Sequence, residues 1–184
     1  LKMQETAVRF AICDDDKVYA EKMKALILQT FHLPQPVECV IYLNQEQILK
    51  CYREDKIDIV FMDIEFGDTI GFQVARRLSR QDSQLAVVYM TNYEHYITEA
   101  FVCRPLGFIR KSHAEDDLQI AGQEIRHFIG QKYSRFVFGG GTAVVEVPLY
   151  KVYAVEIYGH DMVILLDDEN IRVRDKLCLL YTSP

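Results

Sequence analysis

Five side chains that could carry out chemistry each follow or end a short apolar run: Asp14, Asp15, Asp63, Thr91 and Lys111. If the carboxylates come together, two unit charges about 4 Å apart repel by about 4 kcal/mol at an effective dielectric constant near 20. Such a cluster needs a cation, and Mg²⁺ is a hard ion that takes oxygen ligands. An aspartate beside Mg²⁺, flanked by a hydroxyl and an ammonium, can act as a nucleophile toward a phosphoryl group.

A more ordinary interpretation applies to each of these residues taken alone. A single aspartate after a strand is usually a helix cap or a solvated turn residue, and we expect Asp16 to cap the helix that follows it. The complete set, in this order along the chain, is much more specific. We therefore favour one functional site over several unrelated caps.

Positioning these side chains requires a sheet whose strands end at a common edge. The first two-thirds of the chain alternates β-branched apolar runs with amphipathic stretches, which predicts repeated βα units and a parallel sheet. The carboxyl ends of parallel strands meet at one edge, where such folds place their sites. The apolar runs are Val8–Cys13, Val37–Leu43, Ile57–Met62, Leu85–Met90 and Gly107–Ile109.

The last third of the chain has a different pattern. A helix is predicted from Glu115 to about Gln131, and apolar residues alternate with a period of two from Arg135 onward. The segment Gly139–Gly141 predicts a hairpin turn, and further short strands follow. The sequence therefore predicts a second, all-β part after a boundary near residues 131–134.

Composition limits the classes of protein that fit. The 184 residues are 49% apolar and 26% charged, which is typical of globular proteins. No apolar run approaches the roughly 20 residues that cross a bilayer, and the N-terminus has no signal pattern, so we expect a cytoplasmic protein without membrane contact. Five cysteines without a C-x-x-C pair indicate reduced thiols. The net charge of −6 argues against a chain dominated by nucleic-acid contacts.

Four segments resemble the receiver domain of bacterial two-component response regulators. They are I-C-D-D-D, F-M-D-I-E, Y-M-T-N and F-I-R-K-S, and the resemblance covers residues 6–130 in the order expected of that family. It implies a flavodoxin-like (βα)5 fold with a five-stranded parallel sheet. It further implies that Asp63 is the phospho-acceptor, that Asp14 and Asp15 hold Mg²⁺ together with Asp63, and that Glu65 gives its backbone carbonyl to the metal.

The same resemblance assigns the remaining site residues. Thr91 would be the switch hydroxyl that moves toward the phosphoryl group, and Lys111 would be the lysine that pairs with that group. Phe108 would be the aromatic residue that rotates with the switch, and Gly71 matches the turn glycine of the family. Ser112 departs from the family pattern, because a proline usually follows the lysine.

The segment 134–177 resembles the start of a LytTR-type DNA-binding domain. The resemblance is carried by V-P-L-Y-K-V-Y-A-V-E and by R-V-R-D-K-L, and it implies a partial all-β domain, because a whole domain of this type is longer. His160 could face DNA, although such a histidine is more often a solvated turn residue. We expect residues 178–184, C-L-L-Y-T-S-P, to be a non-native tail.

These resemblances together imply a transcriptional response regulator with a receiver domain at 1–130 and the DNA-binding segment at 134–177. A sensor histidine kinase would phosphorylate Asp63 with Mg²⁺ as cofactor, and phosphorylation would favour a homodimer that binds promoter DNA. The protein would not be a conventional enzyme, because it would catalyse only its own phosphorylation and dephosphorylation.

Two alternatives remain open at this point. The receiver could signal through protein contact without DNA binding, which the acidic balance of residues 134–184 favours, with five Lys and Arg against seven Asp and Glu. The second alternative is an aspartyl-phosphate hydrolase of the haloacid-dehalogenase kind. That family needs a second aspartate two residues after the first, and this sequence has Glu65 there.

Overall fold

The chain divides into two compact units, Leu1–Arg126 and His127–Pro184. The computed structural model describes residues 7–67, 69–82, 84–93, 96, 105–140, 143–159, 161–166, 169–174 and 178–182. Helix α5 (Ala114–Tyr133) begins in the first unit and ends in the second. The domain bounds expected from the sequence, 1–130 and 134–177, stay predictions.

The first unit is built on a five-stranded parallel sheet with the strand order β2-β1-β3-β6-β7. The strands are β1 (Val8–Cys13), β2 (Val37–Tyr42), β3 (Ile59–Asp63), β6 (Ala86–Thr91) and β7 (Gly107–Arg110). Every residue of β3 is buried, as expected for a strand that is covered on both faces. The predicted flavodoxin-like sheet is confirmed.

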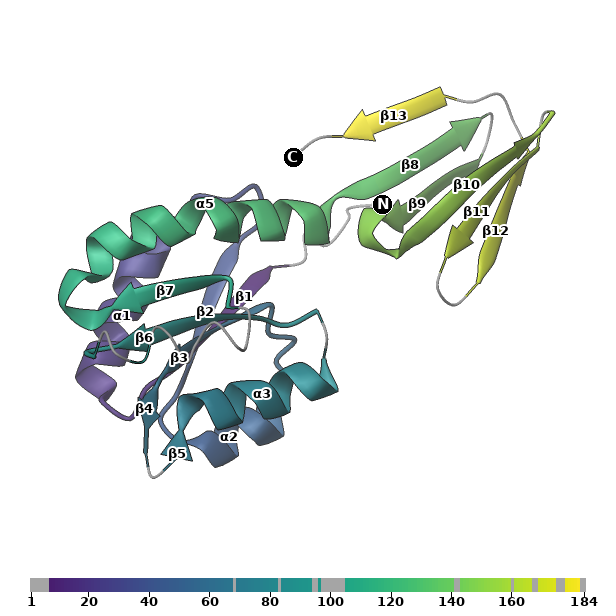
Figure 1. The fold of residues 1–184 in the computed structure, drawn as a ribbon. Coiled ribbons are helices and arrows are strands. Elements are labelled where there is room, and N and C mark those ends of the chain that lie inside the picture. The colour runs from purple at the N-terminus through teal and green to yellow at the C-terminus, as the bar shows by residue number, and fades with distance from the viewer. Residues whose placement is uncertain are drawn as a thin grey trace. The chain divides into compact units, whose positions relative to one another are not determined.

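Helices cover both faces of this sheet. Figure 1 shows α2 (Gln45–Cys51) and α3 (Gly71–Gln81) on one face and α1 (Lys17–Thr30) with α5 on the other. The shorter elements of this unit are β4 (Glu65–Phe66), β5 (Thr69–Ile70) and a 3-10 turn at Lys111–His113. Among the described residues, no helix combines the length and apolar character needed to cross a membrane.

Side-chain caps explain where the first two helices begin. Asp16 caps α1, because its Oδ1 accepts hydrogen bonds from the backbone N–H groups of Val18 (2.9 Å) and Tyr19 (3.1 Å). Asn44 caps α2 in the same way, 3.0 Å from the backbone nitrogen of Gln47. The capping role expected for Asp16 is confirmed, so α1 begins directly after Asp14 and Asp15.

Aromatic contacts support the sheet from both sides. Phe10 of β1 makes edge-to-face contacts with Phe31 and Phe61, with ring centroids 5.6 and 5.7 Å apart. Tyr89 of β6 meets Phe72 of α3 in the same geometry at 4.7 Å. Aromatic pairs prefer this arrangement because the positive ring edge faces the negative ring face. These contacts hold the central strands in place beneath the edge that carries the aspartates.

The second unit contains two three-stranded antiparallel sheets, in the orders β13-β8-β9 and β10-β11-β12. The strands are β8 (Arg135–Gly140), β9 (Ala143–Pro148), β10 (Val152–Tyr158), β11 (Asp161–Leu166), β12 (Asn170–Arg174) and β13 (Cys178–Thr182). Val147, Met162, Ile164 and Val173 form a small buried core. The β-rich second part predicted from the period-two pattern is confirmed.

Some details of this unit differ from the sequence prediction or lie beyond the description. Gly139 and Gly140 belong to β8, where Gly140 pairs with Ala143, so the strand is longer than predicted. Gly141 and His160 lie outside the described residues. The expectation that residues 178–184 are a non-native tail stays a prediction, and β13 within this segment pairs with β8.

Candidate functional site

The register of the parallel strands brings the predicted site residues to one edge of the sheet. Cys13 of β1 pairs with Met62 of β3, so Asp14 comes level with Asp63 one residue further on. On the other side of β3, Asp63 pairs with Met90 of β6. Residues far apart in the sequence therefore meet because all five strands end at the same edge.

Lys111 closes this edge from the end of β7. Its Nζ lies 2.7 Å from Oδ2 of Asp63, to which it donates a hydrogen bond, and 2.6 Å from Oδ2 of Asp14. The contact with Asp14 is an ion pair to a buried oxygen, and among the described residues no other group contacts this oxygen as a hydrogen-bond donor, so it can meet a further donor or cation. The Lys111 side chain is only 10% exposed.

The electrostatics of the pair follow from this burial. Burial raises the pKa of Asp14, the ammonium of Lys111 opposes that rise, and the negative charge of Asp63 adds to it. Burial lowers the pKa of Lys111, but the two carboxylates more than offset it, so that pKa is raised. Lys111 therefore stays a cation between two carboxylates.

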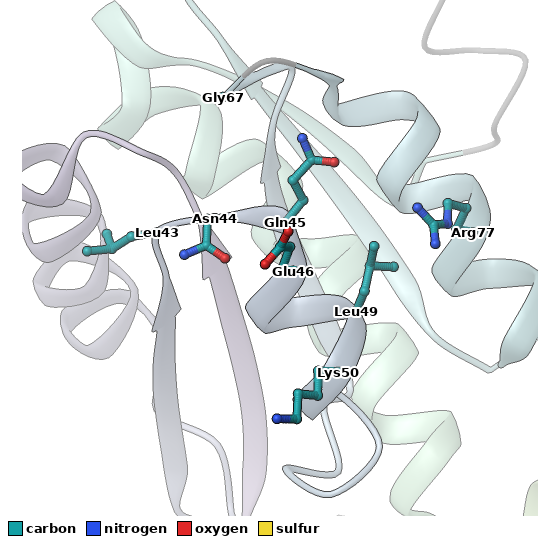
Figure 2. Close-up of a pocket in the computed structure, with 8 residues that line it drawn as sticks. All are labelled: Leu43, Asn44, Gln45, Glu46, Leu49, Lys50, Gly67 and Arg77. Atoms are coloured by element: carbon teal, nitrogen blue, oxygen red, sulfur yellow. The ribbon is translucent and has the colours of Figure 1, made fainter.

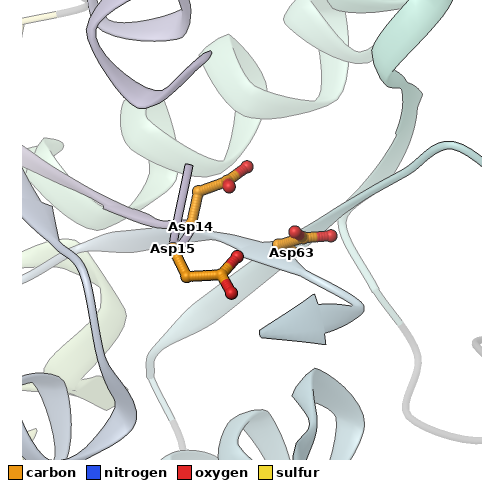
Figure 3. A group of neighbouring side chains, drawn as sticks. All are labelled: Asp14, Asp15 and Asp63. Atoms are coloured by element: carbon orange, nitrogen blue, oxygen red, sulfur yellow. The ribbon is translucent and has the colours of Figure 1, made fainter. Parts of the chain in front are cut away.

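Asp14, Asp15 and Asp63 form a cluster suited to a metal ion. One carboxylate oxygen from each residue lies within 4.8 Å of the others. Figure 3 shows the three side chains. Oxygens bound to one Mg²⁺ at about 2.1 Å lie at most about 4.2 Å apart, so this spacing is close to what one ion needs. Within the described part of the chain, the ion pairs of these three carboxylates involve only the ammonium of Lys111, and the remaining negative charge favours a divalent cation. The residues present fit Mg²⁺.

A comparison with protein families identifies the family of the domain that carries this site. Residues 10–122 match the response regulator receiver domain. The chain belongs to the response regulator receiver family. This match contains every site residue that the sequence predicted in the first unit. The receiver resemblance read from the sequence is therefore confirmed.

Several relatives of this receiver chain are described as sensory transduction proteins. It is 25% identical over 130 residues to LytT of Oceanobacillus iheyensis, which covers 70% of this chain and 52% of that protein. It is 31% identical over 102 residues to LytR of Streptococcus mutans, covering 54% of this chain and 41% of that protein. A match to LytT of Enterococcus faecalis, 24% identical, covers 87% of this chain and 62% of that protein. The chain spans about half the length of the first relatives.

Several solved structures with a similar fold are described as receiver or response regulatory domains. The response regulatory domain of mrkE from Klebsiella pneumoniae superposes with a TM-score of 0.58 at 19% identity, over 66% of this chain and 98% of that one. A receiver domain protein from Clostridium thermocellum gives 0.56 at 18% identity, over 65% and 94%. These structures support the receiver fold of the first unit.

Thr91 and Phe108 occupy the neighbouring strands of the receiver sheet. Thr91 is fully buried at the end of β6, and its Oγ1 accepts a hydrogen bond from the backbone N–H of Tyr93 at 3.0 Å. Phe108 of β7 is partly buried and packs against the core, where it pairs with Tyr89 of β6. Their switch roles stay predictions.

Glycine is required at position 71 by a close approach to the receiver site. A Cβ atom at Gly71 would lie 2.0 Å from the carbonyl oxygen of Asp63, and the Gly71 N–H donates a hydrogen bond to Ile64 at 2.7 Å. The start of α3 thus packs directly on the backbone that carries Asp63. Glu65 of β4 lies two residues after Asp63, and its N–H donates a hydrogen bond to Oδ1 of Asp63 at 3.2 Å.

Sequence reasoning missed two contacts around Lys111. The ring of Tyr19 lies over its ammonium, with 4.7 Å between Nζ and the ring centroid. Asp117 of α5 accepts hydrogen bonds from the backbone and the guanidinium of Arg110, the residue before Lys111, at 2.7–2.8 Å. These hydrogen bonds lower the pKa of Asp117 against the opposing effect of burial. The sequence offered no local signal for either contact, because Tyr19 fits the apolar spacing of its helix and Asp117 is one of three acidic residues in the first turn of α5.

A separate surface pocket lies between α2 and α3 of the receiver. Figure 2 shows its lining residues: Leu43, Asn44, Gln45, Glu46, Leu49, Lys50, Gly67 and Arg77. None of the clustered aspartates lines it. The pocket beside Lys111 is a different one, formed with Lys22 of α1 and the start of α5.

Proposed function

We propose that this chain is part of a response regulator that accepts a phosphoryl group on Asp63. The observation that carries the proposal is the position of the Lys111 ammonium, 2.7 Å from Asp63 and 2.6 Å from Asp14 at the edge of a receiver sheet. A carboxylate beside a fixed cation and an oxygen-rich metal site is suited to in-line attack on phosphorus. A sensor histidine kinase in the cytoplasm would be the phosphoryl donor.

The phosphoryl group would pass from a histidine of the kinase to Asp63. A carboxylate oxygen of Asp63 forms a bond to phosphorus while the bond from phosphorus to the imidazole nitrogen of the kinase breaks, and the released imidazole takes up a proton. Lys111 pairs with a phosphoryl oxygen, which replaces its present contact with Asp63. When bound, Mg²⁺ supplies positive charge that neutralises the phosphoryl oxygens. Asp14, Asp15, Asp63 and the backbone carbonyl of Glu65 would hold it.

The switch that reads this modification involves Thr91 and Phe108. We expect the Thr91 hydroxyl to move toward the phosphoryl group and Phe108 to turn inward with it. The altered face would favour a homodimer. The chain would then act as its own phosphorylation catalyst and its own substrate, with slow hydrolysis of the acyl phosphate as the only turnover.

The second unit would bind promoter DNA as the start of a LytTR-type domain at residues 134–177, next to a receiver domain at 1–130. The LytT match that covers 87% of this chain extends into this unit, which supports the proposal. His160 would be a DNA contact.

Signalling by protein contact alone is the second candidate, favoured by the five basic against seven acidic residues of 134–184. Affinity for DNA that falls steeply with salt would support the first candidate, and no binding by the full-length regulator would support the second.

Acetyl phosphate with Mg²⁺ provides the test of the acceptor. Intact-mass spectrometry should show one added phosphoryl group on the wild-type chain and none on Asp63→Asn. Asp82→Asn is the matched control, because Asp82 serves a turn by accepting from the backbone of Gln84 at 2.9 Å. Undiminished labelling of Asp63→Asn would contradict the assignment.

A further inference from the structure

The ammonium of Lys111 is enclosed on three sides. Oδ2 of Asp14 and Oδ2 of Asp63 occupy two of them, and the ring of Tyr19 occupies the third at 4.7 Å from Nζ to the centroid. A lysine ammonium is a point charge with three donors on a flexible four-carbon stem, so its own geometry does not fix its position. The surrounding groups must do so.

The aromatic contact is of a kind that attracts a cation. The face of an aromatic ring carries negative potential, and its attraction for an ammonium increases when water is excluded. Water is largely excluded here, because the Lys111 side chain is 10% exposed. The Tyr19 hydroxyl contacts Sδ of Met23 on the next turn of α1 at 3.9 Å. The ring rather than the hydroxyl therefore faces the site.

Two hydrogen bonds connect the backbone of Tyr19 to Asp14 through Asp16. Oδ1 of Asp14 accepts from the N–H of Asp16 at 2.9 Å, and Oδ1 of Asp16 accepts from the N–H of Tyr19 at 3.1 Å. The first turn of α1 is thereby fixed relative to the carboxylate that contacts Lys111. The backbone that carries the ring is consequently fixed relative to Asp14, while Asp63 contacts the same ammonium from β3.

We propose that Tyr19 is a positioning residue that holds the Lys111 ammonium beside Asp63, so that an incoming phosphoryl oxygen meets a cation already in place. The inference rests on the proposed role of Asp63 as acceptor. Without the ring, the lysine stem can move away from the carboxylates, and ordering it again weakens binding of the phosphoryl group.

Beryllofluoride, which binds a carboxylate as a phosphoryl analogue, provides a test that does not depend on turnover. The full chain with Mg²⁺ is titrated with beryllofluoride and followed by fluorine NMR, as wild type, Tyr19→Leu and Tyr19→Phe. Tyr19→Leu should weaken beryllofluoride binding roughly three- to tenfold. Tyr19→Phe should bind beryllofluoride as tightly as the wild type does, because the aromatic ring is retained. Tyr19→Met replaces the leucine variant if that variant fails to fold.

Two further readouts separate positioning from a general structural role. The Mg²⁺ concentration for half saturation should stay within about twofold in Tyr19→Leu, since the oxygen ligands are unchanged. The ¹⁵N-labelled ε-amino signal of Lys111 should lose its protection from exchange with water in Tyr19→Leu alone. Val18→Ala is the control on the same turn, because Val18 is 81% exposed.

The outcomes distinguish this inference from the proposed function. Unchanged beryllofluoride binding in Tyr19→Leu, equal loss in Tyr19→Phe, or a parallel loss of Mg²⁺ affinity would overturn the positioning role. A wild-type chain that neither binds beryllofluoride nor accepts a phosphoryl group would instead contradict the role of Asp63.

Discussion

Replacing Asp63 with asparagine should stabilise the metal-free protein, although the substitution removes one partner of a buried ion pair. Breaking such a pair usually costs about 3–5 kcal/mol, because a charge is left without compensation. Here Asp63 stands among two other carboxylates, Asp14 and Asp15, that repel it, and Lys111 keeps Asp14 as a partner when Asp63 is neutral. The sign of the effect depends on which contribution is larger.

The distances allow the magnitude to be worked out. At separations of no more than 4.8 Å and an effective dielectric constant of about 20, each of the two neighbouring carboxylates repels Asp63 by at least about 3.5 kcal/mol. At 2.7 Å the Lys111 ammonium attracts it by about 6 kcal/mol on the same scale. The repulsion slightly exceeds the attraction. We therefore expect Asp63→Asn to raise the free energy of unfolding by about 1 kcal/mol.

Thermal unfolding followed by circular dichroism in EDTA provides the assay. A gain of about 1 kcal/mol corresponds to a rise in Tm of about 2–4 °C for a chain of this size. Lys111→Met should lower stability by about 3–5 kcal/mol, because three carboxylates then lack a cation. Asp82→Asn is the control and should change stability by less than about 0.5 kcal/mol. A loss of 3 kcal/mol or more in Asp63→Asn would refute the reasoning.

Three further predictions concern the surroundings of the cluster. Gly71→Ala should lower the free energy of unfolding in urea by about 3 kcal/mol, because its Cβ would lie 2.0 Å from the Asp63 carbonyl oxygen. Gly130 has open space around it, so Gly130→Ala should be neutral or stabilising. Equal effects of the two substitutions would contradict the packing argument. Asp117→Asn should cost about 1–2 kcal/mol at pH 7, a figure reduced for the partly exposed Arg110 guanidinium. Because the pKa of Asp117 is lowered in the folded state, this stabilisation is present above the unfolded pKa near 3.9 and is lost as pH falls through the folded pKa. A difference in stability between variant and wild type that persists at lower pH would argue against the ion pair. Asp15→Asn should weaken the affinity for Mg²⁺ roughly tenfold, measured from the shift of Tm with Mg²⁺ concentration. Asp16→Asn should leave this affinity unchanged, and equal responses of the two variants would exclude Asp15 as a ligand.

The sheet and the chemistry at its edge could be predicted from the sequence because both depend on local order along the chain. Each β-branched run ends in a polar residue, and parallel strands bring those ends together whatever their spacing in sequence. For this reason the sequence alone predicts that Asp14, Asp63 and Lys111 lie close together. The period-two pattern after residue 135 identified the second unit by the same kind of local signal.

Contacts that depend on three-dimensional approach could not be predicted in this way. Gly71 matched a turn position, but its close packing on the Asp63 carbonyl depends on how α3 meets β3. Asp117 was one of several acidic residues in the first turn of α5, and nothing local distinguishes the one that contacts Arg110. Tyr19 resembled an ordinary apolar position of an amphipathic helix. In each case the decisive contact depends on how a helix packs against the end of a strand, which the sequence pattern does not show.

The central claim is that Asp63 carries the phosphoryl group, and chemical location of that group tests it most directly. After incubation with acetyl phosphate and Mg²⁺, borohydride reduces an aspartyl phosphate to homoserine, which mass spectrometry of peptides can place in the sequence. The account predicts homoserine at position 63 alone, and only when Mg²⁺ is present. Homoserine at another aspartate, or a phosphoryl group on a hydroxyl or imidazole side chain that borohydride leaves intact, would contradict it.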